Sequence, residues 1–409
     1  MDSLLKRYLK GDATIWMVFA MLCIVSIIEM YSASSQLAYS SASHTAPIIR
    51  HVGFLALGTV LAVIVHVIPY RFIRLFAYVG LGISFFLLIF VLLKGEKSND
   101  ASRWLILFGI KFQPSEMAKI SVIIVAADFI SRIKNHKTDE KKYFWNTILM
   151  LAVICPLILL ENFSTAFVLF GVVVLMMFIG KVSLIRLSLL GASLLLALVM
   201  GYFIVKNLPK ENMPKFLDRS YTWVGRIDRF AEEKDETQKY VITDENLQEQ
   251  HGKIAIARGG FFGLGPGNSI QRDYLPQAYS DFIYAIIVEE TGLIGGVFVI
   301  LLYLILLFRA GKIATESPTV FPAVLVIGLS LMIVIQTFVS MSVATSLGPV
   351  TGQPLPLISR GGTSTLITCI YFGIILGITS QIKQKENKAV NNLDEKREEN
   401  IPVVNMAEI

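Results

Sequence analysis

The sequence contains little cysteine and little charge. Only three of its 409 residues are cysteine, Cys23, Cys155 and Cys369, and each lies in an apolar stretch without a nearby Cys or His partner. This spacing supports neither a disulfide framework nor a zinc site, and it favours small core residues instead. Charged residues make up 17% of the chain and hydrophobic residues 54%. This balance favours one bundle of membrane helices over several soluble domains.

Several catalytic motifs are also absent. The patterns HExxH, GxSxG and GxxxxGK do not occur, which leaves hydrolytic triads, tightly held metals and nucleotides without candidates. The glycine-rich GLGPGNS at 263–269 follows no predicted strand, so it does not indicate nucleotide binding. The formal net charge is +6, but the basic residues cluster at the ends of apolar blocks rather than in one patch interleaved with aromatics. We therefore expect no nucleic-acid partner.

Apolar residues occur in blocks of about twenty separated by short polar joints, which is the pattern of a helical membrane protein. We predict an all-α polytopic fold with about ten transmembrane helices. Their approximate ranges are 14–33, 51–69, 74–93, 115–131, 145–161, 164–180, 184–206, 282–308, 320–345 and 363–382. The N-terminal MDSLLKRYLKGD has the charges of a signal peptide, but the apolar run after it is about twenty residues long and includes Glu29. We therefore predict an uncleaved first span.

Basic residues in the short joints predict the orientation of the chain. They gather on one side of the predicted spans, at residues 6–10, 71–74, 132–142, 181–186, 309–312 and 383–388. That side is cytoplasmic by the positive-inside rule, so both termini are expected in the cytoplasm. The longest polar segment, 207–280, then lies outside, and we expect part of it to be mobile and part to dock on the bundle. The predicted organisation is a cytoplasmic N-terminus (1–13), a transmembrane domain (14–382) and a cytoplasmic tail (383–409).

Three carboxylates in the segment Leu275–Gly292 are candidate functional groups, because an ionisable side chain in a membrane span is costly unless it is paired or hydrated. Asp281 is predicted at the outer mouth, opening a helix. Its alternative role is an N-cap. Glu289 and Glu290 follow two helical turns further on. For them a structural pair with a cation from another helix is the simpler interpretation.

Two other segments carry suitable cations. In RWLILFGIKFQPSEMAK (103–119), Pro114 and Glu116 suit a first helical turn, and Lys119 shares a face with Glu116 at i+3. The alternative is an ion pair that only anchors the helix end. In SLGPVTGQPLPLISRGGTS (346–364), Arg360 precedes two glycines. Backbone donors and an arginine suit a phosphate or pyrophosphate, and the alternative is an ordinary re-entrant turn.

Together these segments resemble the SEDS family (shape, elongation, division and sporulation), which takes in FtsW, RodA and SpoVE. The resemblance covers residues 14–382. It depends on the RW at 103–104, FQPSEMAK at 112–119, the segment 259–296 and GQPLPLISRGGTS at 352–364, which follow the family's order. The sequence GNSIQ, which precedes YLP, resembles the FtsW and SpoVE branch more closely than RodA. This resemblance indicates a division-type member.

The chain departs from the family pattern in several motifs, including the usual SGYQ...QS lead-in to the glycine-rich stretch of the outer loop. The family's PDxGTA appears as 161–166 without its Pro and Asp, and HTDF appears as Tyr279–Phe282 without its His. ISYGG appears with Arg360 at its third position, which adds a positive charge. Because of these departures, the contacts that these positions make with the substrate are expected to differ from those in the family. The departures retain Asp281, Glu116 and Lys119, so activity is still expected.

The resemblance implies a peptidoglycan glycosyltransferase of the cytoplasmic (inner) membrane that polymerises lipid II during cell division. It implies Asp281 as general base in an inverting transfer with undecaprenyl pyrophosphate as the leaving group. Residues expected to bind the pyrophosphate or to support the site are Glu116, Lys119, Arg103, Arg226, Arg229, Ser359 and Arg360.

The resemblance also implies partners and leaves alternatives. No tightly bound cofactor is expected, although Mg²⁺ or Mn²⁺ is a candidate for charge neutralisation. The expected partners are a class B penicillin-binding protein that acts as transpeptidase, and other divisome membrane proteins. Two alternative functions remain: a lipid II flippase or transporter, and a non-catalytic divisome scaffold.

Overall fold

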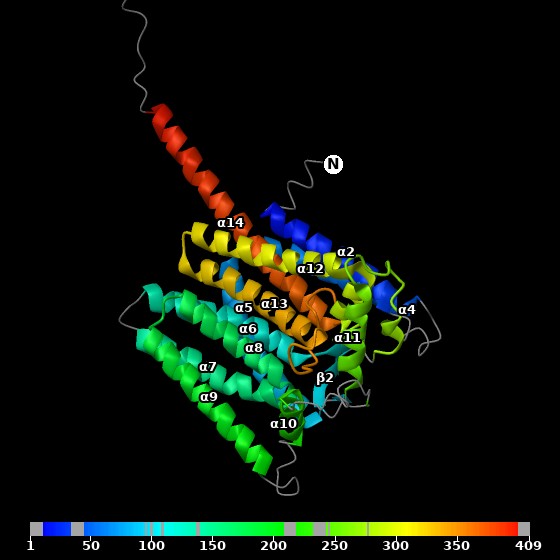
Figure 1. Cartoon of the computed structure of the whole chain (residues 1–409). Coiled ribbons are helices and arrows are strands. Elements are labelled where there is room, and N and C mark those ends of the chain that lie inside the picture. The colour runs from blue at the N-terminus through cyan, green and yellow to red at the C-terminus, as the bar shows by residue number, and fades with distance from the viewer. Residues whose placement is uncertain are drawn as a thin grey trace, which may run out of the picture.

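Long helices occupy each of the ten apolar stretches predicted from the sequence (Figure 1). The computed structural model describes residues 11–33, 45–94, 96–98, 101–107, 110–135, 140–207, 218–231, 243, 246–275 and 278–399. The long helices are α2 (Ala13–Ala33), α4 (Ala46–Val67), α5 (Tyr70–Lys94), α6 (Pro114–Asn135), α7 (Glu140–Glu161), α8 (Phe163–Ile179), α9 (Leu184–Asn207), α12 (Ile283–Glu316), α13 (Val320–Ala344) and α14 (Thr363–Glu399).

Eight of these helices, as far as the chain is described, are long and apolar enough to cross a membrane. The other two are α8, which is apolar but has only 17 residues, and α6, which carries Glu116, Lys119, Asp128, Arg132 and Lys134. The predicted class of a helical, multi-pass membrane protein is confirmed. The count of ten spans stays a prediction.

Two features at the ends of the bundle were not predicted. A small antiparallel sheet of order β1-β2-β3 joins α5 to α6, formed by β1 (Glu96–Ser98), β2 (Ala101–Leu107) and β3 (Ile110–Phe112). In β2, Leu105 is buried and Ile106 is exposed, the alternation that a strand imposes. At the other end of the chain, α14 continues past residue 383, where we placed the start of the tail, to Glu399.

The segment between α13 and α14 enters the bundle, with Leu355 and the residues from Pro356 to Ser359 buried. Three of its backbone carbonyls accept hydrogen bonds from side chains of three different helices. Ser26 of α2 donates to Ile358 O (3.0 Å), Tyr303 of α12 to Pro356 O (2.5 Å) and Gln336 of α13 to Pro354 O (3.2 Å). The re-entrant turn that the sequence left as an alternative is therefore present, and its position is fixed by the surrounding helices.

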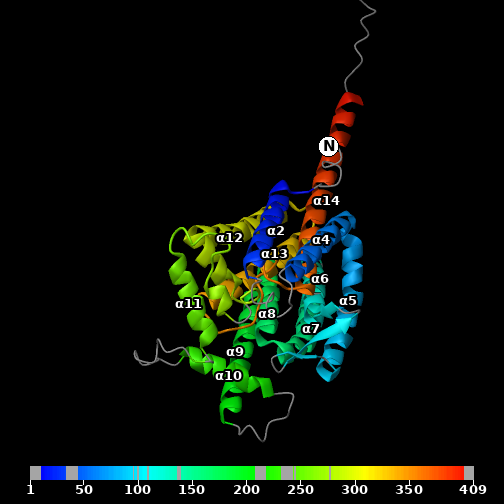
Figure 2. The ribbon, with the colours of Figure 1, turned by 90° about the vertical axis from the view of Figure 1, so that its right-hand side faces the viewer.

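α12 is interrupted at Gly292, whose φ of 71° and ψ of −173° are not helical. The interruption leaves backbone groups of α12 without helical partners, and residues that follow α11 (Leu247–Gly259) bind them. Leu264 N and Gly265 N donate to Glu289 O (3.0 Å) and Glu290 O (2.8 Å), and Leu293 N donates to Gly260 O (2.9 Å). The C-terminal part of the predicted outer loop thus docks on the bundle, as expected (Figure 2).

Glycines permit this close backbone contact. A Cβ added at Gly263, where φ is +77°, would lie 2.1 Å from Glu290 O, and one added at Gly259 would lie 2.0 Å from Val288 O. Both distances are far below van der Waals contact, so the docked segment tolerates no side chain at either position.

We predict that Gly263→Ala lowers the free energy of unfolding by about 3 kcal/mol, since it adds both overpacking and an unfavourable φ. The matched control is Gly191→Ala on α9, where an added Cβ has no atom within 4 Å and alanine favours the helix. Thermal unfolding of the purified protein in detergent measures both variants. Equal unfolding temperatures for the two variants would contradict the proposed contact.

Candidate functional site

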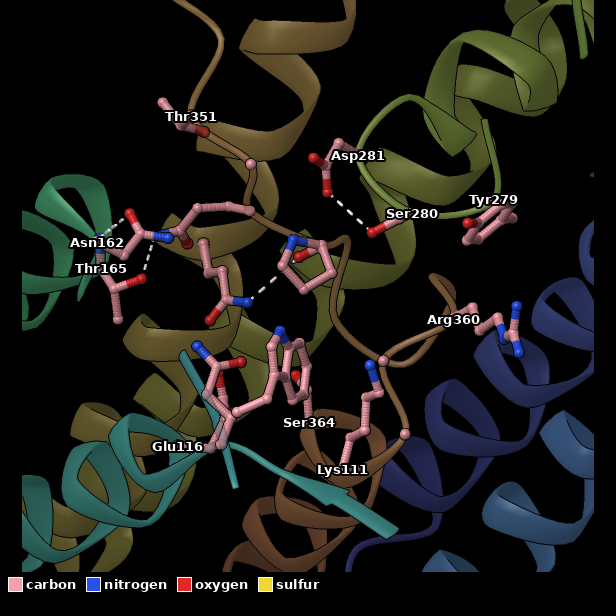
Figure 3. A pocket seen from close by; sticks show the side chains of 18 of the residues that line it. Lys111, Glu116, Asn162, Thr165, Tyr279, Ser280, Asp281, Thr351, Arg360 and Ser364 are labelled. Atoms are coloured by element: carbon pink, nitrogen blue, oxygen red, sulfur yellow. Dashed lines mark hydrogen bonds between the residues drawn. The ribbon is translucent and has the colours of Figure 1, made fainter. Parts of the chain in front are cut away.

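A cavity of about 790 Å³ lies where the predicted outer ends of the helices meet. It is lined by the N-terminal parts of α4, α6, α8 and α14, by Gln336 of α13, by the segment before α12 and by the loop after α13. Further lining residues come from β2, from β3 and the segment between it and α6, from α10 (Asp218–Ala231) and from α11. Figure 3 shows that Asp281 and Glu116, which are far apart in sequence, border the same space.

Asp281 lies in this cavity and is half-buried. The N-cap alternative is wrong, because α12 begins at Ile283 with Phe282 as its N-cap, and no side chain caps the helix. The Asp281 carboxylate instead accepts a hydrogen bond from the Ser280 hydroxyl (2.9 Å). The carboxylate therefore lines the cavity and is not the N-cap of α12.

The re-entrant turn holds the segment that carries Asp281. The Ser359 hydroxyl donates to Ser280 O (2.5 Å) and accepts from Leu355 N (2.8 Å), and the Arg360 amide donates to Tyr279 O (3.0 Å). The Arg360 guanidinium also lies over the Tyr279 ring, 5.4 Å from its centre. Ser359 is only 2% exposed and its hydroxyl proton is already donated. Its position fits support of the Asp281 segment rather than substrate binding.

Glu116 and Lys119 form the ion pair predicted from their i+3 spacing, with Lys119 Nζ 2.8 Å from Glu116 Oε1. Lys119 Nζ also donates to Gln336 Oε1 (3.1 Å), and Gln336 donates through Nε2 to the re-entrant turn. Lys119 is 2% exposed. Because a buried ammonium needs such partners, this network fixes the Lys119 charge at the cavity wall.

The cavity carries an excess of positive charge. Among the described residues, five basic side chains line it against two carboxylates. The basic ones are Arg50, Lys111, Lys119, Arg226 and Arg360, and the acidic ones are Glu116 and Asp281. Burial lowers the pKa of the Arg360 guanidinium, and the positive charge of Arg50 lowers it further. A bound anion would relieve this crowding of cations.

The structure places most, but not all, of the predicted site residues at the cavity. Arg226 of α10 lines it and donates to Val350 O (2.7 Å). The side chains of Arg103, in β2, and Arg229, in α10, lie outside the described residues. Their predicted roles stay predictions.

Sequence reasoning missed several lining residues: Arg50, His51, Lys111, Asn162, Gln336 and Gln353. Gln336 had a usable signal, because an amide in the middle of a long apolar helix seeks a polar partner. Lys111 lies in the cation-bearing segment 103–119 but was not singled out, and Arg50 lies at the end of an apolar stretch, where basic residues are common.

Glu289 and Glu290 do not reach the cavity. Both are fully buried, and they accept hydrogen bonds from the backbone of the docked segment, at Gln271 N (3.2 Å) and Gly267 N (2.9 Å) respectively. Glu289 also lies 3.8 Å from Arg258 of α11. The predicted pairing with a cation from another helix is thus confirmed for Glu289, with a structural role for both acids.

No group of three or more His, Cys, Asp or Glu side chains suited to a metal ion occurs in the described parts of the chain. Of the two carboxylates that line the cavity, Glu116 is bound by Lys119. These residues do not form a recognisable metal site, and the divalent cation stays a prediction.

The sequence is similar to those of known proteins along most of its length. The chain is 31% identical to the probable peptidoglycan glycosyltransferase FtsW of Saccharophagus degradans over 388 residues, which cover 92% of this chain and 94% of that protein. It is also 31% identical to the protein of the same name from Bacillus subtilis over 396 residues, covering 94% of each chain.

Two solved structures share the fold. A chain of a peptidoglycan synthase complex, described for its coordination of polymerization and crosslinking, matches with a TM-score of 0.71. It is 23% identical and covers 91% of this chain and 99% of its own. The rod shape determining protein RodA of Thermus thermophilus matches with a TM-score of 0.61 at 22% identity, covering 91% of this chain and 98% of its own.

The family model described as "Cell cycle protein", for FtsW, RodA and SpoVE, matches residues 12–384. This range contains the whole cavity and all the long helices described above except the end of α14 beyond residue 384. The chain belongs to the FtsW, RodA and SpoVE family of cell cycle proteins, the SEDS family.

Proposed function

We propose that the protein is a peptidoglycan glycosyltransferase that polymerises lipid II into glycan strands during cell division. The observation that carries this proposal is a carboxylate, Asp281, in a cavity with a surplus of cations at one end of a membrane bundle. Such a cavity suits a substrate that joins sugars to a lipid through a pyrophosphate. The names of the FtsW relatives support both the activity and the division-type branch.

In the proposed reaction, Asp281 acts as general base. Its carboxylate accepts the proton of the acceptor GlcNAc 4-hydroxyl as the hydroxyl oxygen attacks the anomeric carbon of the donor MurNAc. The bond from that carbon to the pyrophosphate oxygen breaks, and undecaprenyl pyrophosphate leaves with the electron pair. One displacement inverts the anomeric centre. Pyrophosphate needs its charge stabilised more than it needs a proton, so one base is sufficient.

The cations of the cavity are proposed to stabilise the leaving pyrophosphate. Lys119 and Arg360 are the best placed of the predicted residues, because surrounding contacts hold both at the cavity wall. Glu116 orients Lys119, and Arg226 adds a charge from α10. Charges fixed in advance cost no reorganisation when the leaving group develops its negative charge. Arg103 and Arg229 keep the same proposed role.

The proposal also includes the side of the membrane on which the reaction takes place and the protein partner. With both termini in the cytoplasm and ten spans, the cavity faces the outer side of the cytoplasmic membrane. The lining residues gather at that end of the bundle, which favours polymerisation over transport across the membrane. A class B penicillin-binding protein is the proposed partner, with other divisome membrane proteins around it. The similar chain from a complex that coordinates polymerization and crosslinking supports a transpeptidase partner.

We predict that Asp281→Asn lowers the rate of lipid II polymerisation about 100-fold or more, since it removes the base. The matched control is Asp273→Asn, which makes the same change at an exposed acid that does not line the cavity. Glycan chains formed from lipid II by the purified protein with its transpeptidase partner are measured on gels. Unchanged polymerisation by Asp281→Asn would refute the base assignment.

Arg360→Gln is expected to raise KM for lipid II about tenfold, because one charge-assisted contact to the pyrophosphate is lost. Lys253→Gln is the control, since Lys253 forms an exposed pair with Glu249 (2.6 Å) away from the cavity. Initial rates at several lipid II concentrations separate KM from kcat. Equal KM values for the two variants would exclude Arg360 from substrate binding.

Ser359→Ala is expected to lower kcat about tenfold with KM nearly unchanged, because Asp281 loses positional support but no cation is removed. Ser342→Ala serves as control, because its hydroxyl bonds only within its own helix end, to Val339 O (2.8 Å). The same rate measurements apply, corrected for the folded fraction. A change confined to KM would mean that Ser359 contacts substrate directly.

A further inference from the structure

A stretch without charged residues lies between Arg258 and Arg272. Its sequence, GGFFGLGPGNSIQ, is glycine-rich and carries two adjacent phenylalanines. Phe261 is 71% exposed and Phe262 is 82% exposed. In contact with water, two adjacent exposed phenylalanines would be unfavourable, so their exposure calls for an apolar partner.

This stretch binds α12, a candidate membrane span, well beyond the start of that helix. Its tip binds the backbone of α12 around Gly292, through Leu264 N to Glu289 O (3.0 Å) and Leu293 N to Gly260 O (2.9 Å). Gly292 lies nine residues beyond Ile283, the start of α12, which is about 14 Å along a helix axis. In Figure 2, α11 runs along the flank of the molecule from the level of α10 to that of α12.

Several backbone N–H groups of the stretch are bound by the protein itself. Buried carboxylates accept hydrogen bonds from Gly267 N (2.9 Å, to Glu290), Ile270 N (3.3 Å, to Glu289) and Gln271 N (3.2 Å, to Glu289). Inside a bilayer each such group must be satisfied by the protein, because lipid offers no hydrogen bonds. The two carboxylates therefore supply hydrogen-bond acceptors to backbone N–H groups of the loop that lipid could not satisfy.

The exposed phenylalanines continue a lipid-facing surface. Beyond the interruption, α12 exposes Leu293, Ile294, Val297 and Phe298, and Ile294 N bonds to Phe261 O (3.4 Å). A membrane span presents such a row to acyl chains. Because Phe261 is bonded to Ile294, lipid that covers the exposed side chains of α12 would also cover the phenylalanines.

We propose that α11 and residues 260–275 form a re-entrant hairpin whose Phe261–Phe262 tip contacts lipid acyl chains in the leaflet on the cavity side. The hairpin enters and leaves from the same side, with α11 as one arm and residues 263–275, which include Arg272, as the other. The contact concerns the bilayer and does not depend on the proposed reaction.

The test places a tryptophan at the tip and measures its contact with lipid. Phe262→Trp is made in the otherwise unchanged chain and reconstituted in vesicles whose phospholipid is brominated midway along its acyl chains. The matched control is Tyr274→Trp, an exposed position (59%) at the far end of the same hairpin. The emission of the four native tryptophans is subtracted with the unsubstituted protein.

We expect the added emission of Phe262→Trp to fall by roughly half in brominated vesicles, and that of Tyr274→Trp much less, since bromine quenches only near the acyl chains. Quenching of the added tip tryptophan by aqueous acrylamide instead would overturn the proposal. So would emission that neither agent quenches, which would place the tip against protein. Bromine quenching that appears only at high lipid-to-protein ratio would identify the surface as a contact between copies of the chain, and would also overturn it.

Discussion

Backbone N–H and C=O groups that lie within a bilayer must find their hydrogen bonds in the protein, and this constraint shapes both irregular segments of the chain. The turn after α13 meets it with side chains, because Ser26, Tyr303 and Gln336 donate to its carbonyls. The segment after α11 meets it with the backbone of α12, where the interruption at Gly292 frees matching groups. These bonds hold each segment against the helices.

The same hydrogen bonds give the site its geometry. The re-entrant turn is held by three helices, and in turn it holds Ser280 and Tyr279 through Ser359 and Arg360. Asp281 follows directly, so its position depends on contacts that link the turn to α2, α12 and α13. A reacting group supported in this way keeps its orientation without help from substrate, which is what general-base catalysis requires.

Acidic side chains near the cavity differ in role according to their partners. Asp281 accepts from Ser280 and faces the cavity, whereas Glu116 is bound to the Lys119 ammonium. Glu289 and Glu290 are fully buried and bind backbone N–H groups of the docked segment. Burial and hydrogen bonding, rather than residue type, therefore separate the proposed base from three acids that support the fold.

The sequence alone determined the helical membrane class, the approximate limits of the long helices and the Glu116–Lys119 pair, because hydrophobic blocks and i+3 spacing are local properties. It also marked Asp281 and Arg360 through motifs that lie some 80 residues apart. Only the tertiary structure decided that Asp281 is no N-cap, that the Ser359 hydroxyl binds the backbone beside Asp281, and that Gln336 joins Lys119 to the re-entrant turn. These features arise between segments distant in the chain, where a side chain's role depends on which backbone groups the fold brings to it.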